Sequence, residues 1–391
     1  MEKVKMGIIG TGNIARWHVP GYLRHERAEI AAVCDINKET AENCARLWGV
    51  KKTYTDYHDL LKDNEVDAVD ILLPHHLHAT ITVEAAEAGK HIAVQKPMAL
   101  NIRDTDKMIS AARKANVKLM LEECEVFYPP HVKAKELIES GEVGEPSFIR
   151  IGYKHARGQE LRVSGPPRPG LARSMGLVSW RRDPRQFGGG HFFTAGHHKF
   201  AVARYLLGEI KEVRAWIDDI FKPNRLPLIA MWRYVTKGRY GFLDYTFSPK
   251  MHIKSDMGAL GELLEVTGSS GMIWIARCEA QILKVAPLIL YRGTYPGESV
   301  YFDNLKSDYI ESFIGMTHHF VDCILEDKEP LIGGEEGKKI LQFNLAVYKS
   351  AEENGKAVNP QSITDWTWPW ERDPSLLEKI DMSYEPATES A

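Results

Sequence analysis

The sequence predicts a two-domain α/β protein, with an N-terminal doubly wound parallel sheet and a C-terminal α+β domain whose sheet is open and mainly antiparallel. Three observations predict this fold class. Short apolar runs alternate with helical patterns in the first third, a glycine-rich turn follows the first run, and after about residue 125 hairpin-like turns separate the strands. The 391 residues are enough for two or three domains of about 150 residues.

The first domain, predicted over residues 1–125, contains five short apolar runs. They lack polar–apolar alternation, as strands buried on both faces do. The runs are Val4 to Ile9, Ile30 to Cys34, Ala68 to Leu73, His91 to Val94 and Lys118 to Leu121. Helical stretches such as 13–24 and 38–47 connect them, and strand–helix alternation of this kind predicts a parallel sheet with right-handed crossovers.

The second domain, predicted over residues 126–357, has a different rhythm. We expect helices over 129–140, 308–326 and 334–354, and strands over 146–155, 213–221, 228–235, 240–247, 263–267 and 272–275. Turn residues such as those at 236–239 and 267–271 favour antiparallel pairing. Residues 358–391 form a tail that carries three tryptophans.

Composition excludes several classes of function. Lysine and arginine total 50 against 53 acidic residues, a formal charge of −3, which disfavours a nucleic-acid binder. No apolar run approaches the roughly 20 residues of a spanning helix, so no membrane role is expected. The start runs straight into a strand pattern without a signal peptide, and the five cysteines are scattered, so we expect a cytoplasmic protein.

A glycine motif follows the first strand and opens the first helix. It reads Gly10-Thr-Gly12-Asn13-Ile14-Ala15, and Asp35 ends the second strand. Glycines there permit a tight turn and let a pyrophosphate approach the helix N-terminus. An Asp about 20 residues further on accepts ribose hydroxyl hydrogen bonds and repels a 2′-phosphate. The motif therefore predicts NAD binding, with NADP less favoured.

Several motifs together carry a family resemblance over residues 4–355. They are Gly10 to Ala15, Leu72 to His78, Val94 to Leu100, Ala134 to Glu145, and Gly188 to His198. In this combination the chain resembles the glucose–fructose oxidoreductase/inositol dehydrogenase/MocA family. The resemblance implies a Rossmann domain, and a C-terminal sheet that forms homodimers or homotetramers.

The resemblance also assigns residues near the cofactor. The Pro-x-x-x-His segment contributes Pro74, His75 and His78, and the family's Glu-Lys-Pro motif falls on Gln95, Lys96 and Pro97. Gln95 replaces the family glutamate, which retains hydrogen bonding and removes a charge.

Lys96 is the predicted catalytic acid/base, because oxidation of an alcohol needs a group that accepts the hydroxyl proton. Burial beside a cationic nicotinamide would lower its pKa toward neutrality. The family places an Asp and a His four residues apart on one helix face, and these positions hold Thr194 and His198 here. We expect His198 to bind or polarise the reacting hydroxyl, and His197 is a further substrate-binding candidate.

An arginine-rich segment precedes the triple glycine and suits an acidic sugar or a glycoside. Its members are Arg157, Arg162, Arg168, Arg173, Arg181, Arg182 and Arg185. Guanidinium groups bind carboxylates and hydroxyls, and Trp180 can stack on a sugar ring. Trp180 and Arg181 are the favoured substrate contacts, and Glu123 and Tyr128 are further candidates. The length of the segment suggests a lid or a subunit-contact arm.

Histidines cluster at 75–78, 191–198 and 318–319, but without acidic or cysteine partners at familiar ligand spacings, so no metal is expected. The favoured function is NAD-dependent oxidation of a secondary hydroxyl, such as that at C3, of a sugar, glycoside or cyclitol. Two alternatives stay open: a redox-neutral NAD-dependent glycosidase with a transient 3-keto intermediate, and a non-catalytic dinucleotide-binding regulator.

Overall fold

The computed structural model describes residues 3–156, 180–217, 227–248, 260–277 and 283–380. By its internal contacts the chain divides into two compact units. The first unit comprises Met1–Cys124, Gly165–Gly188 and Ser312–Leu341, and the second comprises Glu125–Ser164, Gly189–Glu311 and Gln342–Ala391. Residues 312–341, which the prediction assigns to the second domain, belong to the first unit.

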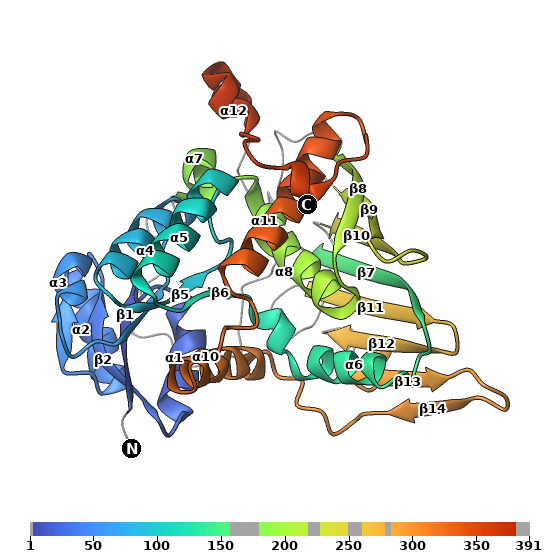
Figure 1. Cartoon of the computed structure of the whole chain (residues 1–391), viewed down its shortest axis with the longest axis horizontal. Helices are drawn as coiled ribbons and strands as arrows, with labels where there is room; N and C mark the ends of the chain where they lie inside the picture. The colour runs from blue at the N-terminus through green and yellow to red at the C-terminus, as the bar shows by residue number, and fades with distance from the viewer. Residues whose placement is uncertain (1–2, 157–179, 218–226, 249–259, 278–282, 381–391) are drawn as a thin grey trace, which may run out of the picture. The chain divides into compact units, whose positions relative to one another are not determined.

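The first unit contains a six-stranded parallel sheet in the order β3-β2-β1-β4-β5-β6 (Figure 1). Its strands are β1 (Val4–Ile9), β2 (Ala28–Cys34), β3 (Lys52–Tyr54), β4 (Ala68–Ile71), β5 (His91–Gln95) and β6 (Leu119–Glu122). The intervening helices are α1 (Ala15–Arg24), α2 (Lys38–Trp48), α3 (Tyr57–Leu61), α4 (His78–Glu87) and α5 (Ile102–Ala115). The predicted doubly wound sheet is confirmed, and the short strand β3 adds to it.

Helix α10 (Tyr309–Leu325) reaches the first unit although it follows the second sheet in sequence. Phe313 stacks on Trp17 of α1 with ring centroids 5.6 Å apart. His318 Nε2 also lies 3.0 Å from the Gly21 carbonyl oxygen. These contacts with α1 explain why residues 312–341 belong with the parallel sheet.

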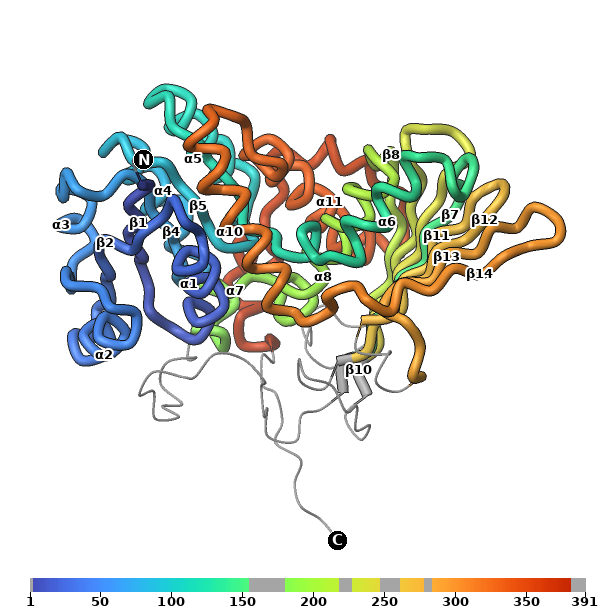
Figure 2. Tube along the Cα trace, turned by 90° about the horizontal axis from the view of Figure 1, so that it is seen from below, coloured from blue at the N-terminus to red at the C-terminus, as the bar shows by residue number. Residues whose placement is uncertain are grey.

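The second unit is built on an eight-stranded mixed sheet in the order β14-β13-β12-β11-β7-β10-β9-β8. The strands are β7 (Pro146–Ala156), β8 (Ile210–Ile217), β9 (Leu228–Tyr234), β10 (Tyr240–Ser248), β11 (Leu260–Gly268), β12 (Gly271–Arg277), β13 (Leu288–Arg292) and β14 (Glu298–Tyr301). Figure 2 shows them running side by side, and only β7 and β10 pair in parallel. The sequence had not indicated β13 and β14.

Helices α6 (Pro129–Glu139) and α8 (Gly190–Leu207) belong to this unit, as do the short helix α12 (Pro369–Arg372) and the part of α11 (Gly334–Glu352) from Gln342 onward. The short helix α7 (Pro184–Phe187) belongs to the first unit. Helix α8 packs on β7 and β10, so alternate residues of each strand are covered. Strand β9, which pairs with β10, shows strict alternation of buried and exposed side chains. No helix in the described ranges combines the length and apolar character needed to cross a membrane.

The C-terminal tail packs its tryptophans on the second unit. Trp368 is only 2% exposed and contacts Phe193 and Tyr348 edge-on, with ring centroids 5.2 and 5.0 Å away. Trp370 stacks on Trp368 at 4.9 Å with an interplanar angle of 9°. The tail therefore contributes to the core around α8.

Four charged side chains lie buried together in the second unit. Lys199 of α8 forms ion pairs with Glu125, at 2.6 Å, and with Glu262. Arg277 pairs with the same two carboxylates and lies 2.9 Å from Glu125. Burial opposes ionisation of Glu262, but Arg277 and Lys199 outweigh it and lower the pKa of that carboxyl. Two cations thus neutralise two anions inside the unit.

Replacing Lys199 with methionine should reduce the free energy of unfolding by about 3–5 kcal/mol, because two buried carboxylates would share one cation. Urea unfolding measures the change. The matched control is Lys133→Met, which removes an exposed pair with Glu136 and should cost less than about 1 kcal/mol. Equal losses of unfolding free energy in the two variants would show that the cost of removing the cation does not depend on burial of the charges.

Candidate functional site

The glycine turn after β1 is shaped by its neighbouring strand. Gly10 has φ +98°, and a Cβ there would lie 2.4 Å from the carbonyl oxygen of Leu72. Its N–H donates to the Cys34 carbonyl oxygen at 2.8 Å. Gly12 is exposed, and a Cβ there would meet no atom within 4 Å. The first glycine is therefore required by the fold, and the second leaves the approach to the α1 N-terminus open.

Two more predicted residues complete this turn. Asn13 is exposed, and Ile14 is the N-cap residue of α1 without a side-chain cap. No acidic residue occupies the first turn of α1, so nothing there competes electrostatically with an anion at the helix N-terminus.

The carboxylate of Asp35 is held beside the glycine turn. Its Oδ2 accepts hydrogen bonds from the Thr11 N–H at 3.0 Å and the Thr11 hydroxyl at 2.8 Å. Its Oδ1 accepts from the Asn37 N–H at 2.9 Å. Asp35 stays partly exposed, and the next residue, Ile36, is 93% exposed. Sequence reasoning did not single out Thr11 or Ile36, although both flank predicted residues.

The segment after β4 is anchored through His78. The His78 ring lies with Nδ1 2.9 Å from the Pro97 carbonyl oxygen and Nε2 2.9 Å from the Leu73 carbonyl oxygen. His78 is fully buried, so its ring connects the loop after β4 to the loop after β5. Pro74 is the N-cap residue of the short helical turn His75–Leu77, which lies in the loop after β4.

His75 lies in an aromatic cluster with Trp180 and Phe187. The ring centroids of Trp180 and Phe187 are 4.9 and 5.2 Å from that of His75. The guanidinium of Arg181 lies over Trp180, 5.3 Å from its ring centroid. Burial, together with the nearby charges of Lys96 and Arg181, lowers the pKa of His75 well below its usual range. The structure therefore brings together residues predicted separately for cofactor and substrate.

Lys96 follows β5 directly and is partly exposed, whereas Gln95 and Pro97 are buried. The Gln95 side chain turns back so that its Oε1 accepts from the Lys96 N–H at 2.9 Å. Its Nε2 lies 2.9 Å from Nε2 of His18. Gln95 thus connects the backbone of Lys96 to a buried histidine that the sequence had not indicated.

His18 belongs to a buried titratable cluster. Its Nδ1 lies 3.1 Å from both Asp70 Oδ2 and Glu122 Oε1. Burial lowers the pKa of His18, but the charges of Glu122 and Asp70 outweigh it and raise the pKa to about 10. Burial and the charge of Asp70 raise the pKa of Glu122 to about 8. Protons are therefore strongly retained in this cluster.

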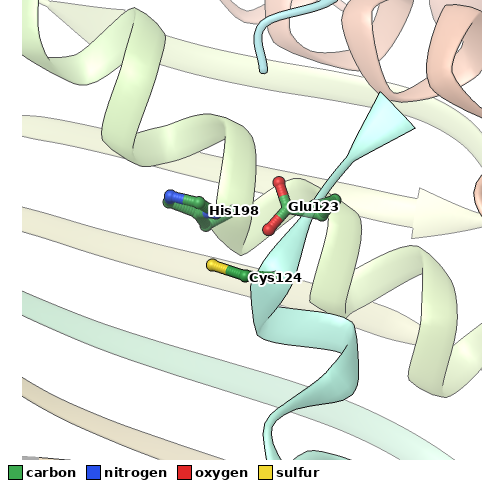
Figure 3. Close-up of side chains that lie close together, drawn as sticks. All are labelled: Glu123, Cys124 and His198. Carbon is green, nitrogen blue, oxygen red and sulfur yellow. The ribbon is translucent and has the colours of Figure 1, made fainter. Parts of the chain in front are cut away.

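In the second unit, α8 carries Thr194, His197 and His198. His197 is fully buried and His198 is 8% exposed. Figure 3 shows the His198 side chain on this helix. The Thr194 hydroxyl donates to the His191 carbonyl oxygen at 3.0 Å, one turn earlier in the same helix. At the start of α8 the Tyr348 hydroxyl donates to the Gly189 carbonyl oxygen at 2.7 Å, which fixes this end of the helix.

The remaining candidates lie in different surroundings. Tyr128 is 1% exposed, and its hydroxyl donates to the Ser307 carbonyl oxygen at 3.1 Å. Glu123 is fully buried directly after β6 (Figure 3). Arg185 pairs with Asp183 through two hydrogen bonds of 2.9 and 2.8 Å. Arg157, Arg162, Arg168 and Arg173 lie outside the described residues, as does most of the predicted lid.

Comparison with known proteins gives a consistent result. Residues 4–123 match the model of the oxidoreductase family with an NAD-binding Rossmann fold, and residues 131–274 match the GFO/IDH/MocA C-terminal domain. Myo-inositol 2-dehydrogenase of Thermotoga maritima is 27% identical over 90% of this chain and 97% of its own length. The NAD⁺-dependent scyllo-inositol 2-dehydrogenase of Bacillus subtilis is 25% identical over 89% of this chain and 94% of its own length.

Solved structures agree on the fold. A probable dehydrogenase from Thermotoga maritima superposes with a TM-score of 0.71 at 26% identity, over 92% of this chain and 99% of its own. Levoglucosan dehydrogenase, solved with NADH and levoglucosan, gives a TM-score of 0.75 at 22% identity over the same shares.

The two glycines of the turn should respond differently to alanine. Gly10→Ala should lower the thermal unfolding midpoint by several degrees, because its Cβ would collide with the Leu72 carbonyl at a positive φ. Gly12→Ala should leave the midpoint within about a degree or two, since open space surrounds that position. Differential scanning calorimetry compares the two; similar losses would contradict the steric explanation.

Proposed function

Because the chain belongs to the Gfo/Idh/MocA oxidoreductase family, we propose that it oxidises a secondary hydroxyl of a sugar, glycoside or cyclitol with NAD⁺, and that Lys96 is the acid/base. The observation that carries the proposal is the position of Lys96, which directly follows β5 near His75, at the edge of the sheet that carries the glycine turn. In open α/β sheets this carboxyl edge is where ligands bind.

The residues present fit a bound NAD. The open space at Gly12 and the free first turn of α1 suit the pyrophosphate. The carboxylate of Asp35, fixed by Thr11, suits the ribose hydroxyls, and exposed Ile36 offers an apolar contact for the adenine ring. When bound, NAD⁺ supplies the hydride acceptor.

The protein's own contribution is proton transfer and positioning. As the carbinol C–H bond breaks and its electron pair leaves as hydride, the O–H proton moves to the Lys96 amine and a ketone forms. His198 would donate a hydrogen bond to the reacting oxygen, without a carboxylate at position 194 to orient it. Trp180, with Arg181 on its face, would contact the sugar ring.

We also propose that the chain forms homodimers or homotetramers through the open face of its second sheet. Trp216, Ile229 and Met231 on this face are 45%, 43% and 45% exposed. Trp216 and Ile229 are directly opposite each other on β8 and β9, so they form one apolar surface. An exposed apolar surface of this kind is typical of a protein–protein contact.

Lys96→Met should lower kcat by about 10²–10⁴-fold, because no other group is proposed to take the hydroxyl proton. Turnover is measured with NAD⁺ on a panel of monosaccharides, cyclitols, uronic acids and glycosides, with products identified by mass. NADH accumulation supports net oxidation, and glycosidic cleavage without NADH would indicate the redox-neutral route. The control is Lys107→Met on the exposed surface of α5. Near-wild-type turnover by Lys96→Met would refute the assignment.

Asp35→Asn should weaken NAD⁺ binding about tenfold and reduce the preference for NAD⁺ over NADP⁺. The amide keeps an acceptor for Thr11, but it loses the charge that repels a 2′-phosphate. Dissociation constants for both dinucleotides, from quenching of tryptophan fluorescence, test this expectation. The matched control is Asp59→Asn at an exposed position of α3. If the ratio of the dissociation constants for NAD⁺ and NADP⁺ does not change, the ribose does not lie beside Asp35.

A further inference from the structure

The orientation of the Gln95 amide determines which protons His18 can carry. Its Oε1 is committed to the Lys96 N–H at 2.9 Å, so its NH₂ group faces Nε2 of His18, also at 2.9 Å. An amide NH₂ donates and does not accept. Nε2 of His18 must therefore accept this hydrogen bond, and the ring carries its proton on Nδ1.

The opposite side of His18 favours a second proton on the ring. Asp70 from β4 and Glu122 from β6 both lie 3.1 Å from Nδ1, and both are buried. The hydroxyl of Tyr22 on α1 is buried near these carboxylates, and its burial, followed by their charges, raises its pKa. The ring of Phe313 on α10 closes the site with its centroid 5.2 Å from that of His18. The carboxylates, which raise the pKa of His18, favour two protons on the ring, whereas the Gln95 NH₂ group fits only a ring without a proton on Nε2. In the structure the amide takes the orientation that fits the singly protonated ring, because its oxygen accepts from the Lys96 N–H.

A doubly protonated His18 would break the connection to Lys96. Its Nε2–H would face the NH₂ group of Gln95, so the amide would have to rotate and present its oxygen to His18. That rotation would turn the NH₂ group toward the Lys96 N–H, and two donors cannot bond each other. A glutamate at position 95 would avoid the conflict, because its two oxygens accept from both sides.

We propose that Gln95 is a positioning residue for Lys96 that acts only while His18 carries a single proton, with any additional proton of the cluster held by the carboxylate of Glu122. The inference deepens the proposed function, since it rests on Lys96 being the acid/base. The charge state of a buried histidine thereby controls how firmly the backbone of the catalytic lysine is held.

The first experiment reads the protonation of His18 directly. In protein labelled with ¹⁵N-histidine, the resonances lost in His18→Gln identify this ring. At pH 7 the wild type should show one protonated and one unprotonated nitrogen, and Gln95→Glu should show two protonated nitrogens. A doubly protonated His18 in the wild type would overturn the proposal, and so would an unchanged ring in Gln95→Glu.

The second experiment reads the hold on Lys96 without turnover. Hydrogen exchange of the Lys96 amide, corrected for its intrinsic rate, should be about tenfold faster in Gln95→Met than in the wild type. Gln95→Glu should retain the protection, as should His18→Gln, whose amide oxygen can accept from Gln95. Equal protection of the Lys96 amide in the wild type and in Gln95→Met would overturn the proposal. If Gln95→Met folds poorly, the ¹⁵N spectrum of the wild type still tests the proposal, because it does not depend on that variant.

Kinetics then separate positioning from general destabilisation. Gln95→Met should lower kcat about tenfold with little change in KM for NAD⁺, and Gln95→Glu should recover most of kcat. If Lys96→Met keeps its turnover, the proposed function fails. The hydrogen exchange of the Lys96 amide and the ¹⁵N spectrum of His18 still test the hydrogen bonds of Gln95 in that case. If Lys96→Met is inactive and Gln95→Met keeps full kcat and protection, only the positioning role fails.

Discussion

Parallel strand pairing is the constraint on which the candidate site depends. Because β1, β2 and β4 pair in parallel with their last residues aligned, Ile9 lies opposite both Cys34 and Ile71. Val94 and Gln95 continue this register across β5 to β6. The residues that follow the strands therefore meet at one edge, although up to about a hundred residues separate them in sequence. The glycine turn, Asp35 and Lys96 owe their proximity to this register.

Much of this edge could be predicted from the sequence, because apolar runs of four to six residues mark buried strands wherever they occur. Among the strands that were missed, β13 carries this signal in Leu288 to Tyr291 and was overlooked, whereas two others lack it. Strand β3 has only three residues, Lys52–Tyr54, and β14 is an exposed edge strand with no apolar face. Nor can sequence order show that α10 packs on α1, since either sheet could have accepted its apolar face.

The site itself was predictable where motifs are local and unpredictable where partners are distant. Gly10, Asp35 and Lys96 stand next to strand ends and were found in that way. The partners of Gln95 could not be, because His18, Asp70 and Glu122 come from three other elements. His78 also shows the limit: its motif placed it beside the cofactor, but no local pattern showed that both its nitrogens face main-chain carbonyl oxygens. Tautomers and hydrogen-bond partners follow from three-dimensional packing, which no local pattern encodes.

The near-parallel contact between Trp368 and Trp370 gives the tail an optical signature. Two indole rings 4.9 Å apart and inclined by 9° are close enough for their electronic transitions to couple. Their circular dichroism therefore depends on the tail being seated against Phe193 and Tyr348, at the start of the helix that carries His198. The chain thus contains a label-free spectroscopic reporter of how this end of α8 is supported, independent of any ligand.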